Sequence, residues 1–446
     1  MSKLIGKRAV VVGAGIGGLT AARVLADHFE HVLILERDTL PAEPEDRPGI
    51  PQGRHVHGLL RGGQDALEAL LPGFERDLAA GGAVLLRAGL DLRIERPGFD
   101  SFPQRDVGVS SYAMSRPLLE VTVRRLLVKS CPNAEIREGC RVHGLVASPT
   151  AVTGVRWDGG DGRIEVLAAD LVVDASGRGI LTLDALKSMA HALPDETAIG
   201  VDLNYATAVY DIPGDAPGDW QGLFVFASVR GAGGAILLPL EGKRWIATIG
   251  TRHDEKAPAD EAAFLAFAER LRQPTLHDAI RRSTLRGPVT RFGFPESLFR
   301  HYERLGAFPP GLLPIGDAIC RFNPVHGQGM SVAAMEACAL RRVLAQRAAE
   351  TDPLNGLAPA FFTEAADLIE TPWAMAAIPD FLHPKTRGER PPGFAKTIKF
   401  SLALIKLAVR DPEVHRLTVE VQHLLKPRSV YQDPELVQRV MAVMDE

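Results

Sequence analysis

The chain has 446 residues, of which 46% are hydrophobic and 24% charged, and its formal net charge at pH 7 is −4. This length and composition are typical of a globular protein with two or three structural units, and the slightly acidic balance excludes a general nucleic-acid-binding surface. We find no signal peptide and no apolar run of about 18 residues, so we expect a cytoplasmic protein without a membrane-spanning helix. The four cysteines form no Cys-x-x-Cys pair, so we expect no metal site.

Residues 8–37 predict a strand, a glycine turn, a helix and a second strand that ends at an acidic residue, Glu36. The turn reads Gly13-Ala14-Gly15-Ile16-Gly17-Gly18, and the helical pattern after it places Leu19, Ala22, Leu25, Ala26 and Phe29 on one face. This is the layout of a dinucleotide-binding βαβ unit. Gly13 permits the tight turn, Gly15 lets backbone N–H groups approach a pyrophosphate, and Gly18 lets helix and strand pack closely.

Glu36 adds information about which dinucleotide is bound. Its carboxylate can accept hydrogen bonds from both hydroxyls of an adenosine ribose, which favours FAD or NAD over NADP with its 2′-phosphate. We therefore predict that the adenosine half of the cofactor is bound by Gly13, Gly15, Ile16, Gly17, Gly18, Glu36 and Arg37.

The middle of the chain changes from helical to β-rich sequence. The Pro/Gly-rich segment 41–58 predicts a long loop, and residues 197–252 predict an antiparallel meander. The remaining predictions are helices at 64–81, 116–130 and 259–283, short strands at 134–167, and a buried strand that ends at Asp174-Ala175-Ser176-Gly177.

A second glycine-rich motif follows a strand near residue 313 and precedes a long helix that ends near residue 346. The Asp317 carboxylate can bind a hydroxyl of the flavin ribityl chain, and Gly327 and Gly329 let backbone amides approach the ring. The following helix directs its N-terminus at the N1–C2=O edge, where reduced flavin is negatively charged. Together with the N-terminal unit, this motif indicates FAD, with its flavin half bound by Gly316, Asp317, Pro324, Gly327, Gln328, Gly329 and Met330.

Three motifs, GAGIGG, DLVVDASG and GDAICRFNPVHGQGM, resemble those of FAD-dependent monooxygenases with the para-hydroxybenzoate hydroxylase-like fold, along most of the first 345 residues. The DASG variant and the loop QGRHVHGLL (52–60) are similar to the branch with squalene-epoxidase-like enzymes and bacterial polyene epoxidases. Chain order and resemblance imply an α/β (α+β) fold in three parts. These are a Rossmann-like FAD-binding domain (1–190 and 285–350), an inserted antiparallel β-sheet substrate domain (191–284) and a C-terminal helical region (351–446).

The resemblance also assigns individual residues. It implies that Arg116 lies near the FAD pyrophosphate and ribityl chain, Arg54 beside the isoalloxazine and Val142 near adenine, and that Asp174 belongs to the cofactor site. Arg54, His55 and His57 are candidate catalytic residues, although a structural histidine is the commoner case. His55 and His57 would point to opposite sides of an extended chain, so we do not expect them to act together.

The same resemblance implies the chemistry. Reduced FAD would react with O₂ to give a C4a-hydroperoxide, which transfers one oxygen to an apolar, natural-product-like substrate by epoxidation or hydroxylation. Because no second nucleotide-binding motif is present, electrons would come from transiently bound NAD(P)H or from a separate flavin reductase. Phe224, Phe226 and Trp245 lie on predicted strands that should cover the flavin and could line the substrate pocket, with plain core packing as the alternative.

Other functions remain open. A geranylgeranyl-type alkene reductase shares the fold and motifs. A halogenase is disfavoured because the four tryptophans are too far apart for a WxWxIP motif, and Glu36 and Asp317 argue against a non-enzymatic prenyl-protein escort. Residues 394–409 predict an amphipathic helix with lysines along one stripe. It could touch a membrane surface, but packing across the sheet domain is favoured. We expect a monomer or homodimer.

Overall fold

The computed structural model describes residues 4–99, 102–227 and 233–444. A five-stranded parallel sheet forms the base of the molecule, and its strands lie in the order β16 (Leu312–Pro314), β10 (Leu171–Asp174), β1 (Gly6–Val12), β2 (Phe29–Leu35) and β6 (Ala134–Arg137). Strand β10 is buried along its whole length, and β1 is a buried apolar run from Ala9 to Val12, as expected for a parallel sheet covered on both faces. The predicted Rossmann-like unit is present.

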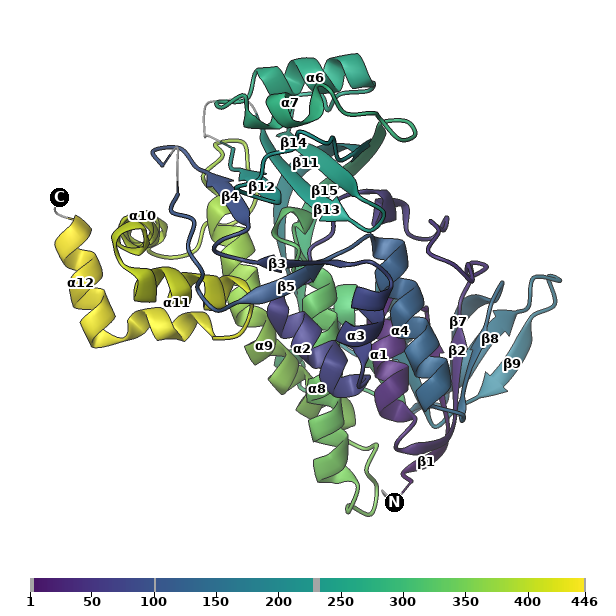
Figure 1. Ribbon diagram of the computed structural model, residues 1–446. Helices are drawn as coiled ribbons and strands as arrows, with labels where there is room; N and C mark the ends of the chain where they lie inside the picture. The colour runs from purple at the N-terminus through teal and green to yellow at the C-terminus, as the bar shows by residue number, and fades with distance from the viewer. Residues whose placement is uncertain (1–3, 100–101, 228–232, 445–446) are drawn as a thin grey trace.

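Helices cover one face of this sheet and a small antiparallel sheet covers the other (Figure 1). On the helical side lie α1 (Ile16–Leu25), α4 (Arg116–Ser130) and α8 (Gly329–Arg347), and on the other side β7 (Arg141–Ala147), β8 (Val152–Asp158) and β9 (Glu165–Ala168). The helix after the glycine turn is shorter than predicted: it ends at Leu25, and the buried Phe29 begins β2 instead of extending the helix. The range 64–81 contains two helices, α2 (Arg61–Leu70) and α3 (Phe74–Ala80), separated at Gly73, which has a positive φ of 92°.

A seven-stranded sheet lies across the carboxyl ends of the parallel strands. Its order is β17 (Cys320–Arg321), β15 (Thr290–His301), β11 (Asp195–Asp211), β14 (Arg244–Arg252), β13 (Gly234–Leu240), β12 (Gly222–Val225) and β4 (Leu92–Glu95). The sheet is therefore larger than the predicted range 191–284, because β4, β15 and β17 come from outside it. It is also not purely antiparallel, since β4 pairs with β12 in parallel register. A hairpin of β3 (Val84–Arg87) and β5 (Ser110–Ala113) lies beneath it.

The two faces of this large sheet have different surroundings. The outer face carries α6 (Glu261–Glu269) and α7 (Thr275–Ile280), and Trp245 packs there with Trp220 and Phe264. The inner face turns toward the parallel sheet and the loop at 52–60, and its apolar residues include Ile246 and Phe224. Because side chains alternate along a strand, the adjacent residues Trp245 and Ile246 lie on opposite faces.

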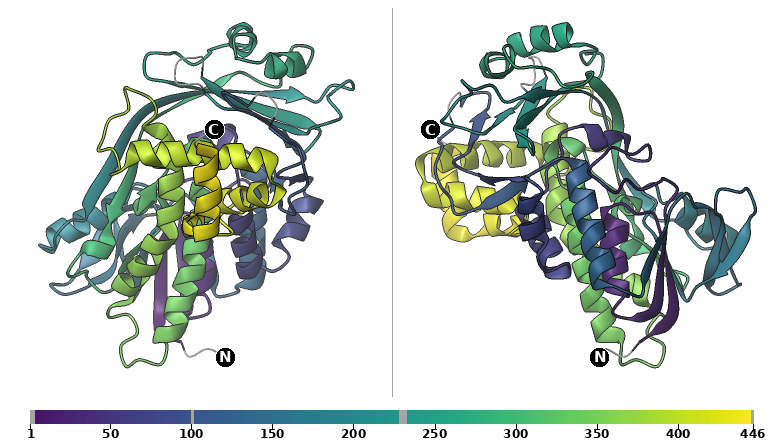
Figure 2. Two further views of the ribbon diagram at one scale, coloured as in Figure 1. Left: turned by 90° about the vertical axis from the view of Figure 1, so that its left-hand side faces the viewer. Right: turned by 45° about the vertical axis from the view of Figure 1, so that its right-hand side comes forward.

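The C-terminal region is helical, as predicted. Helix α9 (Leu357–Asp380) passes beside α8, and α10 (Phe394–Arg410), α11 (Pro412–Gln422) and α12 (Pro434–Met444) form a separate group (Figure 2). The buried residues of α10, Ala403, Leu404, Leu407 and Ala408, pack with α11 and α12, so the expectation that this helix packs across the sheet domain is wrong. Helix α5 (Ile180–Ser188) follows β10. In the described ranges, no helix is both long and apolar enough to cross a membrane.

Candidate flavin site

The first glycine turn lies between the ends of β1 and β10. Gly13 has a φ of 104°, and a Cβ there would lie 2.7 Å from the Ala175 carbonyl oxygen, while a Cβ on Gly18 would overlap the Gly13 carbonyl oxygen. Gly15 differs from both, because a Cβ at that position would meet no atom within 4 Å. Gly13 and Gly18 are therefore required by the chain itself, whereas Gly15 faces open space at the N-terminus of α1, where the helix dipole attracts an anion.

Glu36 lies beside this turn, as the sequence predicted, but it already has partners. Its buried carboxylate accepts hydrogen bonds from the backbone N–H groups of Ala14 (2.8 Å) and Asp38 (3.0 Å) and forms an ion pair with Arg47 (3.1 Å). A carboxylate has about four acceptor positions, so about one remains for a ribose hydroxyl. Binding both hydroxyls requires Arg47 to move. Arg37 is exposed and its guanidinium is directed at the Gly49 carbonyl oxygen (3.4 Å).

Arg47 is a site residue that the sequence analysis missed. It is buried, and its guanidinium contacts the carboxylates of Glu36, Asp38 (3.1 Å) and Glu120 (3.0 Å). Burial lowers its pKa, but the carboxylates of Glu120 and Glu36 outweigh this effect, so the pKa is raised and the residue is charged. Its only sequence signal was a basic residue in the Pro/Gly-rich loop 41–58.

Arg116 connects this network to the flavin end of the site. It is the first residue of α4, where Ser115 caps the helix, and its Nε donates to Glu120 at 2.7 Å. Its charge also lowers the pKa values of Asp317 and His57. Arg116 therefore lies between the two predicted halves of the cofactor site, and its place near the FAD pyrophosphate and ribityl chain stays a prediction.

Asp317 is the most informative residue of the flavin end. Burial raises its pKa to about 6, although Arg321 and Arg116 oppose this shift. Within the described ranges no donor forms a hydrogen bond with its carboxylate. The side chain of Asp317 is half-buried, and a sugar-alcohol hydroxyl would donate the hydrogen bond that its carboxylate lacks. The geometry at Asp317 therefore fits the ribityl chain of FAD.

The turn between Asn323 and Gly329 is held from both sides. The Asn323 amide donates to the buried carboxylate of Asp380 at 2.8 Å, and Gly327, with a φ of 63°, lies against the backbone of Gly58. A Cβ on Gly327 would approach the Gly58 Cα to 3.1 Å. The loop 52–60 and this turn are therefore in direct backbone contact.

The residues around this turn complete the flavin end. Gln328 is buried, and both its side-chain Nε2 and Oε1 lack partners in the described chain, which leaves them available for a ligand. Gly329 begins α8 with its Cα beside the Asp317 carboxylate. Pro324 is exposed and Met330 is half-buried against the core.

The three candidate catalytic residues of the loop have different surroundings. Arg54 is exposed and forms an ion pair with Asp46 at 3.2 Å. His55 is buried, and its Nδ1 lies 2.7 Å from the Thr207 hydroxyl of the sheet. The His57 Nδ1 donates to the His55 carbonyl oxygen at 2.8 Å. Arg54 and His55, together with Arg47, Pro48, Pro51, Thr290 and Arg291, line a cavity of about 300 Å³.

Burial lowers the pKa of both loop histidines. The pKa of His55 falls to about 4, with a smaller contribution from the charge of Arg54, and that of His57 falls to about 3, with a contribution from Arg116. Both imidazoles are therefore neutral at pH 7. This part of the site offers hydrogen bonds but no positive charge from its histidines.

Two cofactor assignments are not supported by side-chain contacts. The buried Asp174 carboxylate accepts four hydrogen bonds from its own chain, two from Ser176 and two from Thr182, at 2.6–3.1 Å. It fixes the turn after β10 and has no acceptor left for FAD, so the prediction that its side chain binds the cofactor is wrong. Val142 lies on β7, pairs with Trp157 and is half-buried against the core.

The three predicted pocket residues do not lie together. Phe224 is on the inner face of the sheet, in the cluster with Val56 of the loop. Phe226 is at the margin, 41% exposed, with the Arg96 guanidinium 4.1 Å from its ring centroid. Trp245 is buried on the outer face, stacked on Trp220 with ring centroids 6.2 Å apart. The prediction that Trp245 lines the pocket is therefore wrong, because strand alternation directs it away from the flavin side.

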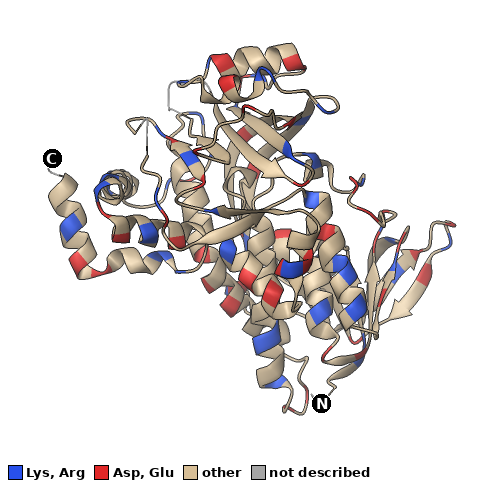
Figure 3. Ribbon diagram, viewed as in Figure 1, with Lys and Arg blue, Asp and Glu red and all other residues tan. Residues whose placement is uncertain are grey.

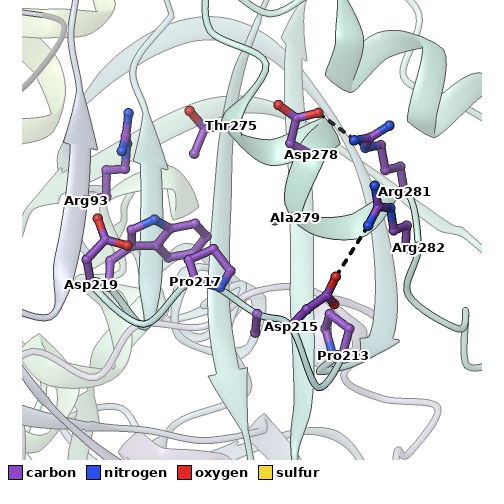
Figure 4. A pocket seen from close by; sticks show the side chains of 12 residues that line it. Arg93, Pro213, Asp215, Pro217, Asp219, Thr275, Asp278, Ala279, Arg281 and Arg282 are labelled. Carbon is purple, nitrogen blue, oxygen red and sulfur yellow. Dashed lines mark hydrogen bonds and ion pairs between the residues drawn. The ribbon is translucent and has the colours of Figure 1, made fainter.

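A second cavity, of about 390 Å³, lies on the outer side of the sheet beside α7 (Figure 4). Four of its charged side chains form two ion pairs, Asp278 with Arg281 at 3.3 Å and Asp215 with Arg282 at 3.4 Å. Since this cavity is on the opposite face from His55 and Phe224, it belongs to a different part of the molecule than the flavin site.

The parallel sheet, with the glycine turn at Gly15 on one side and the unpartnered amide of Gln328 on the other, has the features of an FAD-binding protein. Residues 7–358 match the sequence model of the FAD binding domain family. The chain belongs to this family.

Comparisons with individual proteins agree with this assignment. The chain is 33% identical over 406 residues to Protein Rv3254 of Mycobacterium tuberculosis (strain ATCC 25618 / H37Rv), covering 86% of this chain and 84% of that protein. It is 26% identical over 198 residues to Protein FixC of Escherichia coli (strain K12), covering 43% of this chain and 42% of FixC.

Solved structures share the fold at low sequence identity. The flavin-dependent brominase Bmp2 has a TM-score of 0.70 at 14% identity, covering 99% of this chain and 98% of its own. The p-nitrophenol 4-monooxygenase PnpA of Pseudomonas putida DLL-E4 has a TM-score of 0.67 at 19% identity, covering 96% and 100%. PqsL of Pseudomonas aeruginosa, a probable FAD-dependent monooxygenase, has a TM-score of 0.60 at 18% identity, covering 83% and 96%. The chain is thus a member of the FAD binding domain family with the fold of FAD-dependent monooxygenases, as the sequence motifs predicted.

Proposed function

We propose that this enzyme transfers one oxygen atom of O₂ to an apolar, natural-product-like substrate by epoxidation or hydroxylation. The observation that carries this proposal is the contact between the loop 52–60 and the turn at Gly327, directly beneath the inner face of the large sheet. The inner face contributes apolar side chains such as Phe224 and Ile246. Bound FAD would supply the activation of O₂ there.

The residues of this chain have separate tasks in the proposed reaction. Asp317 and the buried Gln328 amide hold the cofactor, and Arg116 balances negative charge near it. The inner face of the sheet excludes water from the reacting atoms, which protects a reactive oxygen donor. His55 and His57 supply hydrogen bonds without adding charge. An alkene epoxidation needs no side-chain base on the substrate, which suits such a site.

The electron source is part of the proposal. Because the sequence has no second nucleotide-binding motif, either NAD(P)H binds transiently or a separate flavin reductase delivers reduced flavin. We propose a cytoplasmic monomer or homodimer, whose partner is a flavin reductase if NAD(P)H does not bind.

The test is oxygen-18 incorporation by the purified flavoprotein. The enzyme is supplied with ¹⁸O₂ and either NADPH, NADH or a flavin reductase with NADH, together with a panel of polyenes and aromatic polyketides. We expect one ¹⁸O atom per product molecule. The Gly15→Ala variant is the matched control, because it should keep the fold and lose the flavin.

Other outcomes would assign another reaction. A product saturated at one double bond and formed without O₂ would overturn the proposal in favour of an alkene reductase. Brominated or chlorinated product in the presence of halide would overturn it in favour of a halogenase. Flavin-free, colourless protein from native purification would refute the cofactor assignment itself.

A further inference from the structure

A chain of hydrogen bonds joins the loop 52–60 to the inner face of the large sheet. The Val56 backbone N–H donates to the Thr248 hydroxyl oxygen at 3.2 Å, the hydroxyls of Thr248 and Thr207 are 2.6 Å apart, and the Thr207 hydroxyl is 2.7 Å from the His55 Nδ1. Thr207 on β11 and Thr248 on β14 are directly paired across the two strands. His55, Thr207 and Thr248 are 7%, 1% and 6% exposed, so these groups have little access to water.

The direction of this chain follows from its first donor. A backbone N–H can only donate, so the Thr248 oxygen accepts from Val56 and its own proton is free to go to Thr207. Thr207 then donates its proton to the His55 Nδ1. The reverse order would leave the Thr248 hydroxyl proton without an acceptor in the described chain, and a buried unsatisfied donor is unfavourable. Each hydroxyl proton of this chain of hydrogen bonds therefore has an acceptor only when the His55 Nδ1 accepts.

A neutral imidazole that accepts at Nδ1 carries its proton on Nε2. Burial and the charge of Arg54 lower the pKa of His55 to about 4, so the ring is neutral at pH 7. With Nδ1 turned to the sheet, Nε2–H is the polar atom that His55 presents to the cavity it lines with Arg54 and Thr290.

His57 provides an internal comparison. Its Nδ1 lies 2.8 Å from the His55 carbonyl oxygen, which can only accept, so His57 has its proton on Nδ1 and a lone pair on Nε2. Two histidines of one loop, two residues apart, are therefore held in opposite tautomers.

We propose that His55 is a neutral hydrogen-bond donor, with its proton fixed on Nε2 by the positioning residues Thr207 and Thr248, and that it recognises an acceptor oxygen of the substrate, such as a carbonyl or hydroxyl group. Its role toward the substrate rests on the proposed monooxygenase function. The tautomer itself does not, because it follows from contacts within the chain.

The experiment is nitrogen-15 NMR of the FAD-loaded protein labelled at histidine, with long-range correlations that distinguish the two tautomers. The His55 signals are assigned by their loss in His55→Asn, and those of His57 by their loss in His57→Asn. We expect a single Nε2–H tautomer for His55 and a single Nδ1–H tautomer for His57. The Thr207→Val variant should lose the single-tautomer pattern of His55, and Thr207→Ser should restore it.

The controls separate positioning from folding. Thr290→Val changes a threonine that lines the cavity beside His55, and it should leave the His55 tautomer unchanged. An Nδ1–H tautomer for His55 in the unchanged protein would overturn the proposal, as would an unchanged His55 pattern in Thr207→Val. If Thr207→Val fails to fold or retain flavin, Thr207→Ala removes the same hydroxyl with a smaller side chain and should have the same effect on His55. None of these measurements requires turnover, so failure of the oxygenase function would be seen separately.

Discussion

The affinity of the protein for FAD is expected to fall as the pH decreases through 6, because of Asp317. Without a donor, burial raises the pKa of this carboxyl to about 6 from its ordinary value of 3.8. A ribityl hydroxyl that donates to the carboxylate stabilises the ionised form and lowers the pKa in the complex. FAD therefore binds the ionised form more tightly, so the affinity is complete above pH 6 and is lost as the pH falls from 6 toward 4.

The size of this effect follows from linkage. Return of the pKa from about 6 to 3.8 is a change of about two units, or roughly 3 kcal/mol, which corresponds to a ~100-fold change in affinity at its full extent. Between pH 7 and pH 5 the affinity for FAD is expected to fall ~10-fold, because Asp317 takes up one proton for each FAD released.

The assay is titration of apoprotein with FAD, followed by quenching of flavin fluorescence at a series of pH values. Asp317→Asn is the control, since its amide keeps an acceptor oxygen but does not titrate. The ratio of the two dissociation constants isolates Asp317 from titration of the adenine and of other side chains. A ratio that stays constant between pH 5 and pH 7 would refute the reasoning.

Three further predictions concern the turns and the sheet. Gly15→Ala should leave the unfolding temperature of the apoprotein unchanged but lower its FAD affinity at least ~10-fold. Gly18→Ala should instead destabilise the fold, because the new Cβ would overlap the glycine turn. Thermal melts and measurements of flavin content distinguish the two variants. Burial raises the pKa of Glu336 to about 8, so the folded state binds the extra proton and stability falls as pH rises toward 8. In urea denaturation, the free energy of unfolding of the unchanged protein, measured relative to that of Glu336→Gln, should fall by ~2 kcal/mol between pH 6 and pH 7.5. A difference between the two proteins that does not change with pH would contradict this. Trp245→Ala should lower the free energy of unfolding in urea by ~3–5 kcal/mol without altering the flavin spectrum. A change in that spectrum would contradict the buried position of this side chain on the outer face of the sheet.

Much of the cofactor site could be predicted from the sequence because it depends on local conformation. The positive φ values of Gly13 and Gly327 favour glycine over other residues, and Pro117 after Arg116 defines the start of α4. The order of strand, turn and helix likewise follows from short-range patterns, so the family could be predicted. The charge pattern gave no comparable information, since acidic and basic residues are interspersed along the helices (Figure 3).

The errors arose where the outcome depends on distant partners. Strand β4 joins the large sheet by pairing with a strand far along the chain. Asp174 is a different case, because its donors are only two and eight residues away but no sequence pattern identified them as its partners. Arg47 belongs to no sequence motif. Its burial is explained by the carboxylates of Glu36 and Glu120, which lie on either side of its guanidinium in the folded protein.

The sequence alone therefore determined the family, the cofactor and the glycine turns that hold it, because neighbouring residues control those conformations. The tertiary structure decided which side chains face the reacting atoms. His55 and Thr207 are 152 residues apart in the chain, and they meet only because the large sheet folds over the loop. Strand alternation on that sheet then directs Phe224 to the flavin side and Trp245 away from it, a choice made by the pairing of distant strands.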